Sequence, residues 1–122
     1  MTPFGARLRA MRQARGITLS QLAANLGVSP AYLSALEHGK RGQPPWHLVQ
    51  GVIATFNVIW DEAEEIARLA KLSHPRVTVD TAGLAPEATE LANLLARDIG
   101  KLSREEAADL VQRVKRAAGE RE

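Results

Sequence analysis

Basic side chains dominate the first 45 residues and are the groups there best able to take part in binding chemistry. Six lysines and arginines stand against a single acid, Glu37, which gives this segment a net charge of +5. Residues 46–72 have two basic groups against four acids, and residues 73–122 have eight against nine. Such an asymmetry favours binding to phosphate groups, because fixed cations attract a polyanion. The alternative is a solvated basic face that binds nothing.

The residue types that usually catalyse reactions or bind metals lack a suitable arrangement. His38, His47 and His74 lie in three separate contexts, and no spacing puts two of them on one helical face. The acidic pairs lie where helix dipoles favour negative charge, at Asp61-Glu62, Glu64-Glu65 and Glu105-Glu106. The chain has no cysteine, which excludes disulfides and thiolate zinc sites. We therefore expect a protein that is not an enzyme and that needs no cofactor or metal.

The elements that must position the basic groups are predicted to be helices. Aromatic residues make up only 4% of the chain, whereas the helix formers Ala, Leu and Arg are abundant, so an all-α fold is favoured. Apolar spacing predicts helices over residues 4–15, 19–26, 30–38, 46–56, 60–71, 86–99 and 104–118. Trp46 and Trp60 are expected to pack in the core or between helices, and the alternative is that either borders a dimer contact.

Local signals mark how the second and third helices begin. Thr18 and Gln21 have the spacing of a capping box, in which each side chain binds the other residue's backbone amide. Gly27 suits the left-handed turn that ends the second helix. Ser29 can cap the third helix, and Pro30 occupies the first helical position, which tolerates proline best.

These two helices meet the demands of a helix-turn-helix. The motif needs a small residue where the helices cross, a left-handed residue at the turn, and apolar residues that hold the second helix in place. Ala23 and Gly27 fill the first two roles, and Val28, Leu33 and Leu36 fill the third. The combination is specific, although each residue alone is common in helical hairpins.

The stretch RLRAMRQARGITLSQLAANLGVSPAYLSALEHGKRGQPPWHLVQGVIATFNV resembles the lambda-repressor-like, xenobiotic-response-element family of DNA-binding domains. The resemblance covers about residues 4 to 70, and residues 71–122 match no family that we can name. It implies a five-helix domain whose third helix enters the major groove of double-stranded DNA, usually as a homodimer on a palindromic operator. It also places Arg12 and Glu37 at the positions of the family's internal ion pair.

The resemblance implies that the exposed residues of the third helix read the bases. They are Ser29, Pro30, Ala31, Tyr32, Ser34 and Ala35. None is an Arg, Asn or Gln, so the bidentate contacts that identify guanine or adenine, worth roughly 1–3 kcal/mol each, are absent. We expect modest discrimination per base, with a large share from backbone contacts and DNA shape. Tyr32 either reaches the DNA or packs at the rim of its helix.

Phosphate contacts are expected from the start of the second helix and from the loop after the third. The candidates are Ser20, Gln21, Lys40, Arg41 and Gln43. Leu19 stands where many members of the family carry a phosphate-binding glutamine, so that role passes to its neighbours or is lost. Pro45 removes a backbone N–H donor at the start of the fourth helix, which weakens any phosphate contact there. Arg7, Arg9 and Arg15 are expected to be solvated.

The sequence predicts three segments: a DNA-binding domain over residues 1–72, a linker or short edge strand over 73–85, and a helical pair over 86–122. Two helices this short seldom bury their apolar faces alone. Self-association is favoured over binding a partner or packing on the first domain. The expected contact residues are Leu91, Leu94, Leu95, Ile99, Leu110, Val111 and Val114.

The leading hypothesis is a dimeric, sequence-specific transcriptional regulator, and a repressor rather than an activator, because occupancy alone can block a promoter. One alternative is an antitoxin-type autoregulator whose C-terminal helices bind a toxin, and another is an interaction adaptor without a DNA role. The polar N-terminal segment and the lack of a long apolar stretch lead us to expect a cytoplasmic, nucleoid-associated protein.

Overall fold

The computed structural model describes residues 1–119 and is all-helical over that range. The chain divides into two compact units between Val77 and Thr78, within the predicted linker. The predicted helical pair over 86–122 ends with three residues, 120–122, that lie outside the described range. Within residues 1–119, no helix combines the length and the apolar character needed to cross a membrane.

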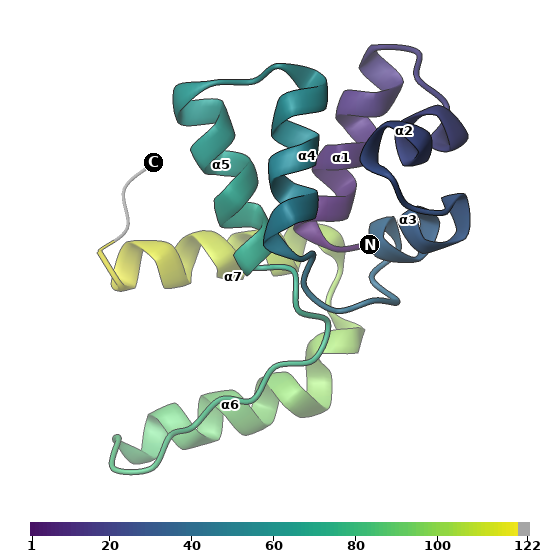
Figure 1. Cartoon of the computed structure of the whole chain (residues 1–122). Helices are drawn as coiled ribbons and strands as arrows, with labels where there is room; N and C mark the ends of the chain where they lie inside the picture. The colour runs from purple at the N-terminus through teal and green to yellow at the C-terminus, as the bar shows by residue number, and fades with distance from the viewer. Residues whose placement is uncertain (120–122) are drawn as a thin grey trace. The chain divides into compact units, whose positions relative to one another are not determined.

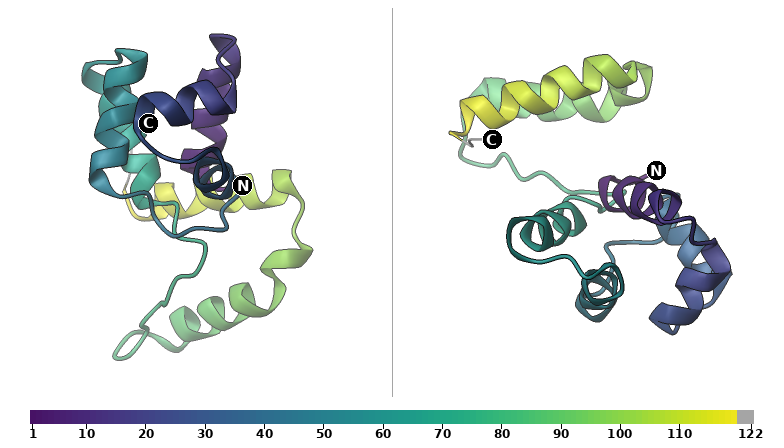
Figure 2. Two further views of the ribbon diagram at one scale, coloured as in Figure 1. Left: turned by 45° about the vertical axis from the view of Figure 1, so that its right-hand side comes forward. Right: turned by 90° about the horizontal axis from the view of Figure 1, so that it is seen from above.

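The first unit contains five helices (Figures 1 and 2), at the places that the apolar spacing predicts to within about two residues. They are α1 (Pro3–Ala14), α2 (Leu19–Leu26), α3 (Pro30–Glu37), α4 (Trp46–Phe56) and α5 (Trp60–Lys71). Helix α1 packs against α3 and α5, α2 packs against α3 and α4, and α4 packs against α5. Every helix contributes to one apolar core, for example through Leu8, Leu22, Leu33, Val52 and Ile66.

The local signals for α2 and α3 are confirmed. The Thr18 hydroxyl accepts a hydrogen bond from the Gln21 amide (3.1 Å), and the Gln21 side chain accepts one from the Thr18 amide (2.9 Å). Gly27 ends α2 in the left-handed region with φ 71°. Ser29 accepts a hydrogen bond from the Tyr32 amide (3.1 Å), and Pro30 follows as the first residue of α3.

Two hydroxyl groups that the sequence analysis missed stabilise the beginning of α1. Thr2 caps the helix by accepting a hydrogen bond from the Gly5 amide (3.0 Å). Ser73, just after α5, accepts a hydrogen bond from the Phe4 amide (2.9 Å) and donates one to the Leu69 carbonyl (2.6 Å). The buried Ser73 side chain therefore ties the start of the first unit to its last helix.

The prediction that both tryptophans are packed is wrong. Trp46 is 60% exposed and Trp60 is 81% exposed. Each is the first residue of its helix, and the core is filled by residues further along, such as Val49 and Ile66. Trp60 also has φ 55°, a conformation that costs a bulky residue free energy.

The second unit contains α6 (Pro86–Asp98), a 3₁₀ turn, η1 (Ile99–Lys101), and α7 (Arg104–Ala117). The segment before it forms no strand at residues 77–79, and its role as a linker remains a prediction. Within the described range, no residue of α6 or α7 is buried. Leu91, Leu94, Leu110, Val111 and Val114 of these helices are exposed, whereas Leu95 is half-buried.

The predicted capping box at the start of α7 is confirmed. The Ser103 hydroxyl accepts a hydrogen bond from the Glu106 amide (3.1 Å), and the Glu106 carboxylate accepts one from the Ser103 amide (2.8 Å). The bond from the Ser103 backbone lowers the pKa of Glu106 below its ordinary value, because it stabilises the charged carboxylate.

Candidate nucleic-acid interface

Helix α3 is held by one face and open on the other. Leu33 and Leu36 are buried in the core, whereas Pro30 and Ala31 are exposed and Ser34 is half-buried. A shallow hollow of about 290 Å³ lies on the open side and is lined by Ala31, Ser34, Ala35, His38 and Lys40. The open face of α3 therefore presents small side chains, with His38 and the cationic Lys40 after the C-terminal end of the helix.

The turn between α2 and α3 sets the direction of α3. After the left-handed Gly27, the Val28 amide donates a hydrogen bond to the Ala23 carbonyl (3.0 Å). Ala23 is fully buried, and the half-buried Val28 packs against the core. This is the tight, apolar turn that a helix-turn-helix requires.

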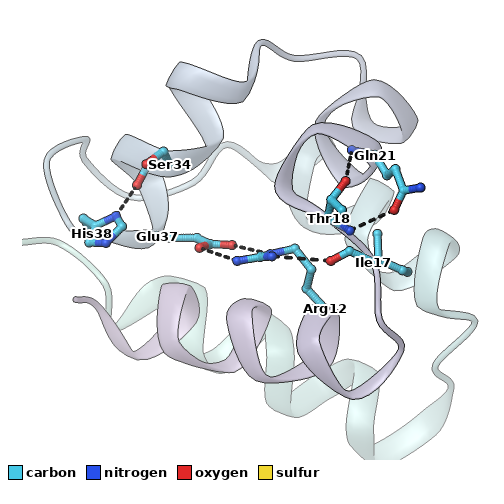
Figure 3. A network of polar contacts seen from close by, with 7 residues as sticks. All are labelled: Arg12, Ile17, Thr18, Gln21, Ser34, Glu37 and His38. Atoms are coloured by element: carbon cyan, nitrogen blue, oxygen red, sulfur yellow. Dashed lines mark hydrogen bonds and ion pairs between the residues drawn. The ribbon is translucent and has the colours of Figure 1, made fainter.

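An ion pair fixes the C-terminal end of α3 (Figure 3). Arg12 Nε lies 3.3 Å from Glu37 Oε2, and Arg12 Nη2 lies 3.4 Å from Glu37 Oε1. Arg12 also donates a hydrogen bond to the Ile17 carbonyl (3.4 Å). The Glu37 side chain is 2% exposed, so the guanidinium is the partner that offsets the cost of burying it. One arginine thus connects α1, the loop before α2, and the end of α3.

The loop after α3 presents two cations. Gly39 has φ 75°, and the Lys40 amide donates a hydrogen bond back to the Ala35 carbonyl (2.9 Å). Lys40 and Arg41 are both exposed. The Arg41 guanidinium carbon lies 5.3 Å from the centroid of the Tyr32 ring, a cation–π geometry.

The remaining predicted phosphate contacts are exposed on two other segments. Ser20 and Gln21 lie in the first turn of α2, and Gln43 lies in the loop before α4. The Gln21 side-chain oxygen is already engaged by the Thr18 amide, so its NH₂ group is the end left to donate to an anion. Pro45 precedes α4 as its N-cap without a side-chain capping bond.

Two arginines that we expected to be solvated form long-range contacts. Arg15 donates a hydrogen bond to the Phe56 carbonyl (2.8 Å) and lies over the Phe56 ring, 5.4 Å from its centroid. Arg7 pairs with Glu62 at 3.5 Å. These guanidinium groups stabilise the end of α4 and the side of α5, whereas Arg9 is exposed as expected. No local pattern connects residues so far apart in sequence.

His38, which the sequence analysis considered only to reject metal and acid-base chemistry, lies beside the candidate interface. Its Nδ1 atom lies 2.8 Å from the Ser34 carbonyl oxygen (Figure 3), and its side chain lines the hollow beside α3. Within residues 1–119, no three His, Cys, Asp or Glu side chains are placed to hold a metal ion.

Comparison with known proteins decides the family. The model of the helix-turn-helix domain family matches residues 3–65, which is more than half of the chain. The chain belongs to the helix-turn-helix domain family. The resemblance to regulators of the xenobiotic-response-element type is thereby confirmed.

Several relatives carry names of the same kind. RghRB of Bacillus subtilis strain 168, an uncharacterised HTH-type transcriptional regulator, is 41% identical over 61 residues, which cover 50% of this chain and 44% of that protein. The HTH-type transcriptional repressor RghR of the same strain is 52% identical over 44 residues, covering 36% of this chain and 33% of RghR. The HTH-type transcriptional regulator RamB of Mycobacterium tuberculosis is 34% identical over 80 residues, covering 62% of this chain and 17% of RamB.

The matches are partial on both sides, since the aligned part spans less than half the length of each of these relatives. Among solved structures, a chain of the SinR protein/SinI protein complex aligns over 96% of this chain and 99% of its own length, with 22% sequence identity and a TM-score of 0.45.

Proposed function

We propose that this helix-turn-helix protein is a sequence-specific, non-enzymatic repressor that inserts α3 into the major groove of double-stranded DNA. The observation that carries the proposal is the open face of α3, which is made of small side chains and flanked by Lys40 and Arg41. A major groove about 12 Å wide admits an α-helix. Small side chains let the helix approach the base edges closely.

The proposed base contacts are the hydroxyls of Ser29 and Ser34 and the methyl groups of Ala31 and Ala35 against thymine methyls, with Pro30 beside them. The Ser29 hydroxyl accepts the capping bond from the Tyr32 amide, and its own proton remains available to donate to DNA. Direct readout of this kind is weak for each base pair. Most of the affinity then comes from phosphate contacts, and much of the specificity comes from DNA shape.

Phosphate contacts are assigned to Lys40 and Arg41, assisted by Ser20, Gln21 and Gln43. Lys40 and Arg41 lie in the loop that begins after the end of α3 at Glu37, so we assign them to the DNA backbone that borders the groove. The hydrogen bond from the Lys40 amide to the Ala35 carbonyl holds the start of this loop against α3, and Lys40 lines the hollow. Asp61 and Glu62, two of the four acids of α5, lie in the first turn of that helix and not on α3 or the loop after it.

We further propose that two copies bind one operator, at the nucleoid in the cytoplasm. A single helix-turn-helix offers few contacts, and two-fold symmetry doubles them across two half-sites. The uncovered apolar residues of α6 and α7 supply a surface for self-association; they include Leu91, Leu94, Ile99, Leu110, Val111 and Val114, with the half-buried Leu95 beside them.

Selection of bound sites from random duplex DNA, combined with the mass of the chain in solution, tests this proposal. We expect half-sites centred about one helical turn apart and an affinity that falls steeply with salt. Arg41→Ala should weaken binding to all sequences alike and reduce the salt slope by about 0.9. Arg113→Ala, which removes an exposed cation from α7 of the second unit, is the matched control and should change neither. Absent or salt-insensitive binding would support the adaptor alternative instead.

A further inference from the structure

The guanidinium of Arg41 stacks on the ring of Tyr32. Tyr32 belongs to a helix, whereas Arg41 has a long side chain with many rotamers. The Tyr32 amide is bound to Ser29 within the first turn of α3, and its half-buried ring packs against the core. Arg41 projects from an exposed loop between Gly39 and Gly42. Its guanidinium nevertheless returns to α3, with its central carbon 5.3 Å from the ring centroid.

Stacking on an aromatic ring leaves an arginine able to bind a phosphate. The ring contacts the flat face of the guanidinium, whereas the N–H donors point outward in its plane. A phosphate binds those in-plane donors, often two at a time. The same guanidinium can therefore be held by Tyr32 and bound to DNA simultaneously.

We infer that Tyr32 is a positioning residue: its ring holds the Arg41 guanidinium beside α3 before DNA arrives. The inference rests on the proposed function, and it gives Tyr32 a role other than base reading. An arginine that is already ordered loses less side-chain entropy on binding. Lys40, the neighbouring cation, has no ring contact among the described residues, so it provides an internal comparison.

The first experiment needs no DNA. In the free protein, the ring current of Tyr32 should shift the NMR signals of the Arg41 side-chain protons upfield. Tyr32→Phe keeps the ring and should keep the shift, whereas Tyr32→Leu keeps the apolar packing but should abolish it. Unshifted Arg41 protons in the wild-type chain would overturn the inference without bearing on DNA binding.

The second experiment measures binding to a mixed-sequence duplex between about 50 and 200 mM salt. Tyr32→Phe should bind like the wild type, and Tyr32→Leu should bind about two- to fivefold more weakly, the equivalent of an exposed cation–π contact. In the Arg41→Ala background, Tyr32→Leu should cause no further loss. In the Lys40→Ala background, Tyr32→Leu should weaken binding by the same factor as in the wild type. These comparisons between backgrounds cancel any general effect of the substitution on folding.

Two results would overturn the inference. If Tyr32→Phe is as weak as Tyr32→Leu, the hydroxyl itself contacts DNA. If Tyr32→Leu weakens the Arg41→Ala variant as much as the wild type, the ring acts independently of Arg41. A wild-type chain that shows the NMR shift but no salt-dependent binding would overturn the proposed function, and the positioning role with it.

Discussion

Gly5 of α1 and Glu37 of α3 approach so closely that a side chain at Gly5 has no room. A Cβ atom built on Gly5 would lie 2.3 Å from the Glu37 carbonyl oxygen and 2.7 Å from its Cα atom. Both obstacles are backbone atoms, so a rotamer change cannot relieve them. The absence of a side chain at Gly5 thus lets α1 and α3 cross closely and sets the position of α3.

Gly5→Ala should destabilise the first unit by about 1–3 kcal/mol or more, because α1 and α3 must separate to admit the methyl group. Urea unfolding followed by circular dichroism measures the effect. Gly42→Ala is the matched control: a Cβ atom there meets nothing within 4 Å. Equal stability of the two variants would show that the crossing is looser than described.

Arg12→Met should destabilise the protein by about 3–5 kcal/mol, because it leaves the buried Glu37 carboxylate without its partner. The double variant Arg12→Met, Glu37→Met should recover most of this loss, since an apolar pair replaces the ion pair. Urea titrations of the wild type, the single variant and the double variant measure these free energies of unfolding. A double variant less stable than Arg12→Met would contradict this explanation.

Ala31→Asp should abolish duplex binding while leaving the fold intact. The residue is exposed on the open face of α3, so the carboxylate would face the phosphates and base edges across the groove. Ala10→Asp, on an exposed part of α1, is the control and should bind nearly normally. Fluorescence anisotropy with labelled duplex measures both, and undiminished binding by Ala31→Asp would place the DNA on another surface.

Leu94→Glu should convert the dimer into a monomer, because it introduces a charge into the proposed apolar contact of α6. Sedimentation equilibrium measures the mass. Glu90→Gln changes an exposed polar residue on the same helix and should leave the dimer unchanged. A wild-type monomer, or a Leu94→Glu dimer, would contradict the role assigned to the second unit. Co-purification of a toxin-like partner with a monomeric wild type would support the antitoxin alternative.

The start of α7 should lose stability in acid. The folded-state pKa of Glu106 is lowered by its hydrogen bonds to Ser103, so the capping contribution is complete above the ordinary carboxyl pKa. It is lost as the pH falls through the lowered pKa of the folded state. Glu106→Gln should remove this pH dependence, as helix content measured by circular dichroism across the acid range can show. An unchanged pH profile in this variant would assign the effect to other carboxylates.

The sequence alone was sufficient to predict each helix of the first unit, the turn at Gly27, and the caps at Thr18, Ser29 and Ser103. These features depend on interactions within one helical turn, so the residue types and their spacing carry the information. The outward residues of α3 followed from the same periodicity.

The family resemblance singled out Arg12 and Glu37, but only the tertiary structure decided the contacts between residues far apart in sequence. Three such contacts depend on how complete helices pack: the crossing of Gly5 and Glu37, the hydrogen bond from Arg15 to the Phe56 carbonyl, and the stacking of Arg41 on Tyr32. The exposure of Trp46 and Trp60 likewise depends on which residues of the five helices occupy the shared core. Side-chain type and local periodicity do not encode that choice, because it is made by the summed packing of five helices at once.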